Sequence, residues 1–179
     1  MPDEKIHKSG FVNIIGNPNV GKSTLMNALV GERLSIITAK AQTTRHRILG
    51  IVNGDHFQMI FSDTPGIVKP VYKLHENMMR FVRTAITDAD IILYVTDVKE
   101  VVNDGNGYTF KIKESGTPVI IAVNKIDLTN QEELERITGF WKETFPHSPV
   151  IPVSALKRFN LDTLLSAVIS NIPFARNSK

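Results

Sequence analysis

Residues 16–24 read GNPNVGKST, and this short stretch decides the fold expected of the chain. It fits the pattern G-x-x-x-x-G-K-[ST], in which successive backbone N–H groups surround the oxygens of a phosphate chain. The apolar run FVNIIG (11–16) leads into it as a strand, and residues 22–30 leave it as a helix that Gly31 can cap. A loop between a strand and a helix N-terminus is the setting that phosphate binding requires.

Outward from this loop, apolar runs alternate with segments of helical period. The alternation predicts an α/β P-loop NTPase fold, with a mostly parallel sheet of about six strands and helices on both faces. The runs RILGIVNG and HFQMIFSD flank the turn at Gly54-Asp55, which predicts an antiparallel pair at one edge of the sheet. The runs IILYVTD, PVIIAVNK and PVIPVS are the later strands.

Helices are expected between these later strands and after them. Thr129 and Glu132 have the spacing of a capping box, and Asn160 is the expected cap of a final helix. The segment 101–115 indicates a helix only weakly. Three apolar faces have helical spacing: Met78, Met79, Val82, Ala85 and Ile86; Leu134, Ile137 and Trp141; and Leu161, Leu164, Leu165, Val168 and Ile172.

Length and composition indicate one globular domain. The chain has 179 residues, 42% of them hydrophobic, and we expect a domain at 10–172 between a flexible N-terminus (1–9) and a loose tail (173–179). The absence of cysteine excludes disulfides and thiolate zinc sites. No apolar run approaches the roughly 20 residues of a membrane span, so we expect a cytoplasmic protein. A net charge of +3 is too weak to indicate nucleic-acid binding.

The phosphate loop predicts roles for individual residues. Backbone N–H groups of 19–23 point at phosphate oxygens, Lys22 reaches the β- and γ-phosphates, and the Ser23 hydroxyl coordinates Mg²⁺. In DTPG (63–66), Asp63 can hold a Mg²⁺-bound water and the Gly66 N–H can meet the γ-phosphate. The residues expected at the nucleotide are Gly16, Asn17, Pro18, Asn19, Val20, Gly21, Lys22, Ser23, Thr24, Asp63, Thr64, Pro65, Gly66, Asn124, Lys125, Asp127, Ser154, Ala155 and Leu156.

The stretch NKID (124–127) identifies the base as guanine. The Asp127 carboxylate can accept from both the N1–H and the 2-amino group of guanine. Adenine offers neither donor, and sites that miss such bonds reject the wrong ligand by about 10⁴. Asn124 would brace this loop against the phosphate loop, and the Lys125 stem would lie over the base. In SAL (154–156), the Ala155 N–H would donate to guanine O6.

Taken in order, GNPNVGKS, QTTRH, DTPG, NKID and SAL resemble the five motifs of Ras-like, translation-factor-related GTPases over about 10–172. AKAQTTRHRILGI and DTPGIVKP resemble more closely the Era family of ribosome-assembly GTPases. The resemblance implies hydrolysis of GTP to GDP and phosphate, with Lys22, Thr44, Gly66 and Asn19 as catalytic residues. It implies that Thr44, or else Thr43, joins Ser23 and Asp63 in coordinating Mg²⁺.

The middle of the phosphate loop bears on the rate of hydrolysis. Ras-type enzymes place a glutamine where this chain has Ile67, and an alkyl side chain cannot orient water. In several relatives, an asparagine at the position of Asn19 helps to coordinate K⁺, and the carbonyls of Thr38 and Lys40 would complete that shell. The alternative is that Asn19 only tolerates a turn conformation, with Pro18 pre-shaping the loop. We expect slow intrinsic turnover, stimulated by K⁺ and by a partner.

Era proteins also carry a KH domain, whose G-x-x-G loop binds the 3′ end of small-subunit ribosomal RNA. No two of the eleven glycines here are three residues apart, so we expect a GTPase domain without the KH domain. The ribosomal RNA or ribosome, and a membrane surface, are then partners implied only for the intact family architecture. This chain is expected to be a monomer that binds guanine nucleotide.

Two functions remain open from the sequence. The first is a GTP hydrolase that acts as a switch in assembly of the small ribosomal subunit, which the complete set of Mg²⁺ ligands favours. The second is a GTP-gated binding module with negligible hydrolysis unless a partner activates it, which Ile67 favours. A small-molecule kinase is a distant third, because NKID argues against ATP.

Overall fold

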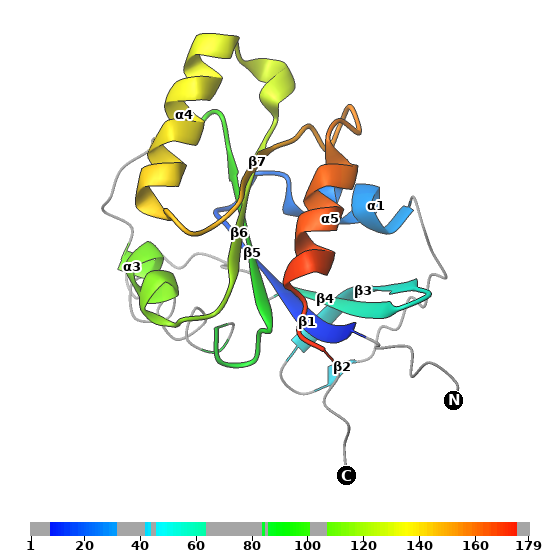
Figure 1. Cartoon of the computed structure of the whole chain (residues 1–179). Helices are drawn as coiled ribbons and strands as arrows, with labels where there is room; N and C mark the ends of the chain where they lie inside the picture. The colour runs from blue at the N-terminus through cyan, green and yellow to red at the C-terminus, as the bar shows by residue number, and fades with distance from the viewer. Residues whose placement is uncertain are drawn as a thin grey trace, which may run out of the picture.

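The computed structural model describes residues 8–31, 42–43, 46–63, 84, 86–100 and 107–174. In these ranges the chain forms a seven-stranded sheet and four α-helices, and residues 84, 86 and 87 are helical as well (Figure 1). The strands are β1 (Lys8–Ile15), β2 (Gln42–Thr43), β3 (His46–Gly54), β4 (Phe57–Asp63), β5 (Ile91–Asp97), β6 (Val119–Asn124) and β7 (Val150–Pro152). The helices are α1 (Lys22–Gly31), α3 (Gly107–Glu114), α4 (Gln131–Thr144) and α5 (Leu161–Asn171), with a 3₁₀ turn η1 (Ile126–Leu128) before α4.

The sheet has the order β2-β3-β4-β1-β5-β6-β7. Strand β1 pairs in parallel with β4 and β5, and β6 pairs in parallel with β5 and β7. Around the turn after Gly54, β3 and β4 pair antiparallel, as the sequence predicts, and β2 adds a two-residue antiparallel edge. The α/β class and the mostly parallel sheet are therefore confirmed, with the short strand β2 beyond the expected six.

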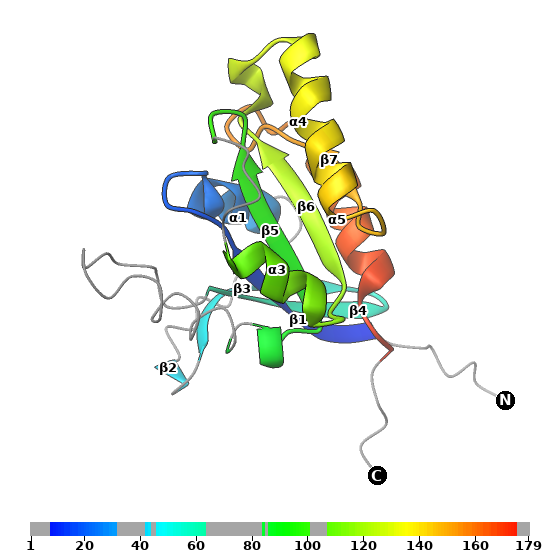
Figure 2. The ribbon, with the colours of Figure 1, turned by 90° about the vertical axis from the view of Figure 1, so that its left-hand side faces the viewer.

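Helices cover both faces of the sheet. Figure 1 shows α1 and α5 on one side and α3 and α4 on the other, and Figure 2 shows α3 in front of β5 and β6. Two buried apolar clusters match these layers, one with residues of α1 and α5 and one with residues of α3 and α4. Every residue of β5 and β6 is buried, because a parallel strand with helices on both faces has no solvent side.

The start of α4 differs from the predicted capping box. Asn130 is the N-cap, and its side chain accepts a hydrogen bond from the Glu133 N–H at 2.9 Å. Thr129 instead ends the preceding turn η1, where its N–H donates to the Ile126 carbonyl. The prediction from Thr129 and Glu132 was wrong by one residue, because the turn that the NKID loop makes uses Thr129 before the helix can begin.

Two other predicted caps take different forms. Asn160 is the N-cap residue of α5, as predicted, but it has φ 60° and its side chain makes no capping hydrogen bond, because it donates instead to the Pro152 carbonyl at 2.8 Å. Gly31 is the last residue of α1 and is not among the glycines with positive φ in the described ranges. The weakly indicated helix in 101–115 is α3.

The apolar faces expected of α4 and α5 are buried as predicted. Ile137 and Trp141 lie in the core, Leu134 packs against it, and the five apolar residues predicted for α5 and its end are all buried. Of the face expected in 78–86, only Ile86 lies among the described residues, partly buried in the same core. Strand β1 begins at Lys8, and Phe174 bridges to it, so the described fold extends two residues past the expected limits of 10 and 172.

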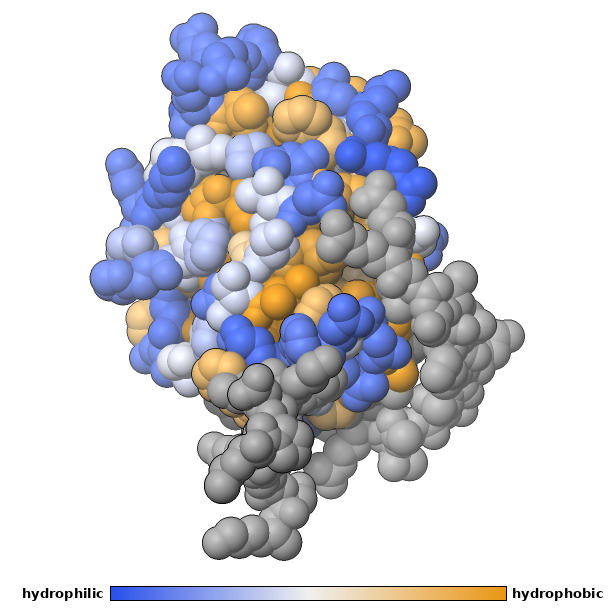
Figure 3. Space-filling view, turned by 45° about the vertical axis from the view of Figure 1, so that its right-hand side comes forward, coloured by the Kyte–Doolittle hydropathy of each residue, from blue (hydrophilic) through white to orange (hydrophobic). Residues whose placement is uncertain are grey.

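The surface is mixed. On the face shown in Figure 3, hydrophilic residues interrupt the hydrophobic ones, as on most folded proteins. None of the helices in the described ranges has the length and apolar character needed to cross a bilayer.

Candidate nucleotide-binding site

The phosphate loop lies between β1 and α1, beside the carboxyl ends of β5 and β6. Both motif glycines are required by close approach of other groups. A Cβ on Gly16 would lie well under 3.0 Å from the Val95 carbonyl oxygen of β5. Gly21 has φ +92°, and a Cβ there would lie equally close to the Asn124 side-chain amide. The loop is therefore pressed against the ends of two strands, and its shape depends on them.

Asn19 and Pro18 form the turn in the middle of the loop. Asn19 has φ 66°, in the left-handed region that asparagine tolerates better than most residues. Its side chain is exposed, and its main-chain carbonyl oxygen accepts a hydrogen bond from the Lys125 ammonium. This conformation accounts for an asparagine in the turn without an ion.

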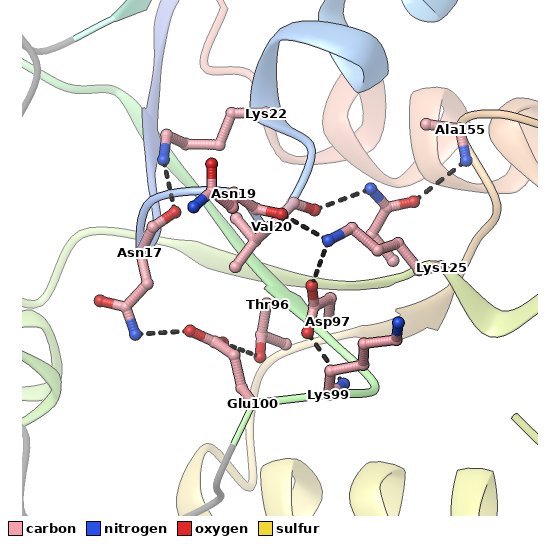
Figure 4. Close-up of polar contacts among 11 residues, drawn as sticks. Asn17, Asn19, Val20, Lys22, Thr96, Asp97, Lys99, Glu100, Lys125 and Ala155 are labelled. Carbon is pink, nitrogen blue, oxygen red and sulfur yellow. Dashed lines mark hydrogen bonds and ion pairs between the residues drawn. The ribbon is translucent and has the colours of Figure 1, made fainter. Parts of the chain in front are cut away.

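The Lys22 ammonium is hydrogen-bonded to the first residues of the phosphate loop. It donates to the carbonyl oxygen of Gly16 at 2.8 Å. It also donates to the carbonyl oxygen of Asn17 at 2.7 Å (Figure 4). Ser23 and Thr24 follow in the first turn of α1, with exposed side chains. The lysine, the hydroxyl of Ser23 and the helix N-terminus thus gather at one place, where they can act on the same anion.

Asn124 joins three loops through one buried side-chain amide. Its Nδ2 donates to the Val20 carbonyl at 2.9 Å, and its Oδ1 accepts from the Ala155 N–H at 3.0 Å. Asn124 is 2% exposed, so both groups are satisfied away from water. The expected brace between NKID and the phosphate loop is present. The Ala155 N–H, expected at guanine O6, donates to Asn124 here.

Ser154 holds the carboxylate that is expected to read the base. Its hydroxyl donates to Asp127 Oδ1 at 2.6 Å and accepts from the Lys157 N–H at 3.1 Å. Ser154 is buried, whereas Asp127 is exposed. An antiparallel β-bridge between Ser154 and Phe159 closes the loop at 154–159. A fixed hydroxyl therefore orients an accessible carboxylate. Leu156, 72% exposed, lies in the same loop.

Asp97, at the end of β5, is a site residue that the sequence did not indicate. Its Oδ2 lies 2.5 Å from the Lys125 ammonium, and its Oδ1 accepts from the Lys99 N–H at 2.9 Å. The ammonium thus lies between Asp97 and the Asn19 carbonyl (Figure 4). Lys125 has φ 62°, a costly conformation that the surrounding contacts must maintain. The signal in the sequence that could have indicated Asp97 is an acidic residue at the end of a buried strand, β5, which lies next to β6.

Glu100 was also missed. It follows β5 by three residues, and its carboxylate contacts Asn17 of the phosphate loop and Thr96 of β5. Its place in the sequence, within the turn VKE, gives no spacing pattern that would connect it to the phosphate loop.

Several predicted site residues lie outside the described ones: Thr38, Lys40, Thr44, Thr64, Pro65 and Gly66. Ile67 also lies outside them. Asp63 is the last residue of β4, and only its backbone is described. The register pairs Asp63 with Ile14, two residues before Gly16, so the DTPG stretch starts beside the phosphate loop. The structure therefore brings together the loops at 16–24, 124–127 and 154–156 and the first residue of 63–66.

Comparisons with known proteins agree with this arrangement. The model of the family described as 50S ribosome-binding GTPase matches residues 11–125. The GTPase Era of Alkaliphilus metalliredigens is 42% identical over 168 residues, which are 93% of this chain and 57% of that protein. A structure of Aquifex aeolicus Era bound to GDP and AlF₄⁻ superimposes with a TM-score of 0.74 at 37% identity, over 94% of this chain and 58% of that one.

A second solved structure shows Era in complex with MgGDPNP and nucleotides 1506–1542 of 16S ribosomal RNA. It has a TM-score of 0.74 at 36% identity and covers 97% of this chain and 60% of that one. The chain thus spans less than two thirds of the length of these relatives. The residues that the family model matches include the phosphate loop, Asn124 and Lys125. In the structure the Asn124 side chain is hydrogen-bonded to the phosphate loop. The chain belongs to the family of 50S ribosome-binding GTPases and, within it, is similar to Era.

Proposed function

We propose that this chain binds GTP and hydrolyses it to GDP and phosphate, as a nucleotide-dependent switch in assembly of the small ribosomal subunit. The observation that carries the proposal is the Asn124 amide, which fixes the phosphate loop and the two guanine-reading loops in one arrangement. The similarity to Era, solved with a GTP analogue and 16S ribosomal RNA, supports the ribosomal part. A ribosomal partner would place the protein in the cytoplasm.

Recognition of guanine rests on Asp127. Ser154 donates to one carboxylate oxygen and so keeps the exposed carboxylate in a single orientation. A carboxylate held in this way accepts from the N1–H and the 2-amino group together, two donors that adenine lacks at that edge. The preference for GTP over ATP follows from this pairing.

Binding of the phosphates rests on Lys22 and the loop amides. The ammonium already points into the loop, where two carbonyl oxygens hold it. Phosphate oxygens carry full charge and accept more strongly than these carbonyls, so the lysine exchanges its loop bonds for phosphate bonds. The N–H groups of 19–23 and the α1 N-terminus add donors that need no rearrangement.

The residues proposed for Mg²⁺ are Ser23, Thr44 and Asp63. Hydroxyl and carboxylate oxygens are the hard donors that this ion prefers. The described residues fit, because Ser23 is exposed in the first turn of α1 and the pairing of Asp63 with Ile14 brings the end of β4 to the start of the phosphate loop. Bound there, Mg²⁺ would neutralise charge on the β- and γ-phosphate oxygens.

Slow turnover and stimulation by K⁺ are the finer part of the proposal. Ile67 supplies no group that could orient the attacking water, so the rate would depend on positive charge near the bridging oxygen. Asn19, with the carbonyls of Thr38 and Lys40, is the proposed K⁺ site. Phosphate release should be faster in K⁺ than in Na⁺, with Lys22, Thr44 and Gly66 as the other catalytic groups.

The positive φ of Asn19 allows a sharp test of the ion. Asn19→Gly keeps the backbone conformation and removes only the side chain. If the side chain coordinates K⁺, this variant still binds GTP but hydrolyses it equally fast in K⁺ and Na⁺. A variant that keeps the K⁺ dependence of the wild type would assign Asn19 to the turn alone.

Calorimetry and single-turnover hydrolysis test the main proposal. The wild type should prefer GTP over ATP by about 10⁴, and Asp127→Asn should weaken GTP while improving binding of xanthosine triphosphate, whose 2-carbonyl accepts where guanine donates. Equal affinity for GTP and ATP would refute the assignment. GTP binding without measurable phosphate release would favour the alternative that Ile67 suggests, a GTP-gated binding module that needs a partner.

A further inference from the structure

Glu100 links the turn after β5 to the front of the phosphate loop. Its Oε1 accepts a hydrogen bond from Asn17 Nδ2 at 2.5 Å, and its Oε2 accepts from the Thr96 hydroxyl (Figure 4). Thr96 is fully buried in β5, where it pairs with Val123 of β6. The half-buried carboxylate is therefore anchored on a buried residue near the carboxyl end of β5 and reaches out to one loop residue.

Asn17 is the part of the loop where this contact has most effect. Its main-chain carbonyl accepts from the Lys22 ammonium at 2.7 Å, while its side chain donates to Glu100. Gly16 before it is pressed against the Val95 carbonyl, and the ring of Pro18 after it fixes φ. With both neighbours constrained, the side-chain bond to Glu100 sets the direction of the Asn17 peptide.

The other contacts of the loop come from a different strand. Asn124, the last residue of β6, donates to the Val20 carbonyl. Lys125, the next residue, donates to the Asn19 carbonyl. These residues belong to NKID and hold the second half of the loop. Glu100 holds the first half from the end of β5, so the loop is supported on both sides of Pro18.

We propose that Glu100 is a positioning residue for the phosphate loop: its carboxylate fixes Asn17, and through it the first half of the loop, in the form that accepts a guanosine di- or triphosphate. The proposal rests on the proposed function and deepens it. Glu100 acts through Asn17 and need not touch the nucleotide. Two acceptor oxygens on a side chain of this length meet two donors, one on the loop and one on β5.

Three substitutions separate position from charge. Glu100→Ala removes the negative charge and the two hydrogen bonds by which the side chain bridges Asn17 and Thr96. Glu100→Asp keeps the charge but is one methylene too short to span Asn17 and Thr96. Glu100→Gln loses the charge but keeps the bridge, because its oxygen accepts from Asn17 while its amide donates to the Thr96 hydroxyl.

The experiment is calorimetry of GDP and GDPNP with these variants, with Asn17→Ala, and with the double variant Asn17→Ala/Glu100→Ala. Glu100→Ala and Glu100→Asp should each weaken both nucleotides by about tenfold, at the upper end of what one intramolecular hydrogen bond contributes. Asn17→Ala should match them. The double variant should be no weaker than either single variant to within about twofold. Glu100→Gln should bind as the wild type does, with an unchanged preference for guanine over adenine.

Glu143→Ala, on the exposed face of α4, is the matched control and should bind as the wild type does. Thermal denaturation of each variant accompanies the titrations. A lower midpoint with wild-type affinity would show a purely structural role and overturn the proposal, as would additive losses in the double variant. Tighter binding by both Glu100→Gln and Glu100→Ala would show that charge decides and would also overturn it. A wild type that binds no guanine nucleotide would refute the proposed function itself. If Glu100→Ala does not fold, Glu100→Asp gives the same answer.

Discussion

The side-chain amide of Asn124 donates to the Val20 carbonyl at 2.9 Å, across 104 residues of sequence. The bond joins the end of β6 to the phosphate loop next to Gly21, whose missing Cβ leaves room for that amide. One buried side chain thereby couples the part of the site that reads the base to the part that binds the phosphates.

Asn124→Ala should therefore cost both stability and nucleotide binding. It leaves the Val20 carbonyl and the Ala155 N–H without this partner in a buried place, and we expect the free energy of unfolding to fall by about 2 to 4 kcal/mol. Chemical denaturation measures the loss. Asn171→Ala, which removes an exposed asparagine of α5, is the control and should change stability by less than about 0.5 kcal/mol. Equal effects of the two substitutions would contradict the coupling.

Two glycine-to-alanine substitutions should act in opposite directions. Gly16→Ala drives a Cβ into the Val95 backbone, which cannot yield as a side chain can, and should destabilise the fold by about 1 to 3 kcal/mol and displace the loop. Gly139→Ala, in α4 with nothing within 4 Å of the new Cβ, should stabilise it by about 0.5 to 1 kcal/mol. Thermal unfolding compares them, and a tolerated Gly16→Ala would show that the loop is not packed as described.

Asp97 and Lys125 should behave as a coupled pair in nucleotide binding. Asp97→Asn removes the charge that holds the ammonium beside the Asn19 carbonyl, and we expect GDP to bind about tenfold more weakly. In a Lys125→Met background, the same substitution should have little further effect. Calorimetry of the two single variants and the double variant gives the coupling energy, expected to be about 1 to 3 kcal/mol. Independent, additive losses would mean that Asp97 acts on something else.

The helix cap of α4 offers a test free of nucleotide. Asn130→Ala removes the side-chain acceptor for the Glu133 N–H and should cost about 1 kcal/mol of stability. Thr129→Ala should cost less than about 0.5 kcal/mol, since Thr129 contributes its backbone N–H to the preceding turn. The two unfolding midpoints decide between them, and the reverse order would restore the cap predicted from sequence.

Local patterns explain which parts of the fold were predicted correctly. The apolar runs at 91–95 and 119–123 became buried strands because their hydrophobicity is continuous, and the turn at Gly54-Asp55 gave the antiparallel pair. The cap of α4 was misplaced because Thr129 and Asn130 are both good caps, and only the turn η1 decides which of them starts the helix.

The sequence by itself determined the α/β class and the motifs at 16–24 and 124–127. Each of these features depends on residues close together in the sequence, so it can be predicted from their types and spacing. Only the tertiary structure decided that Asp97 holds Lys125 and that Glu100 holds Asn17. Those pairs depend on β5 lying between β1 and β6, with Asp97 in register with Asn124. A single carboxylate carries no pattern in sequence; it acquires a partner when parallel strands bring their carboxyl ends to one edge of the sheet.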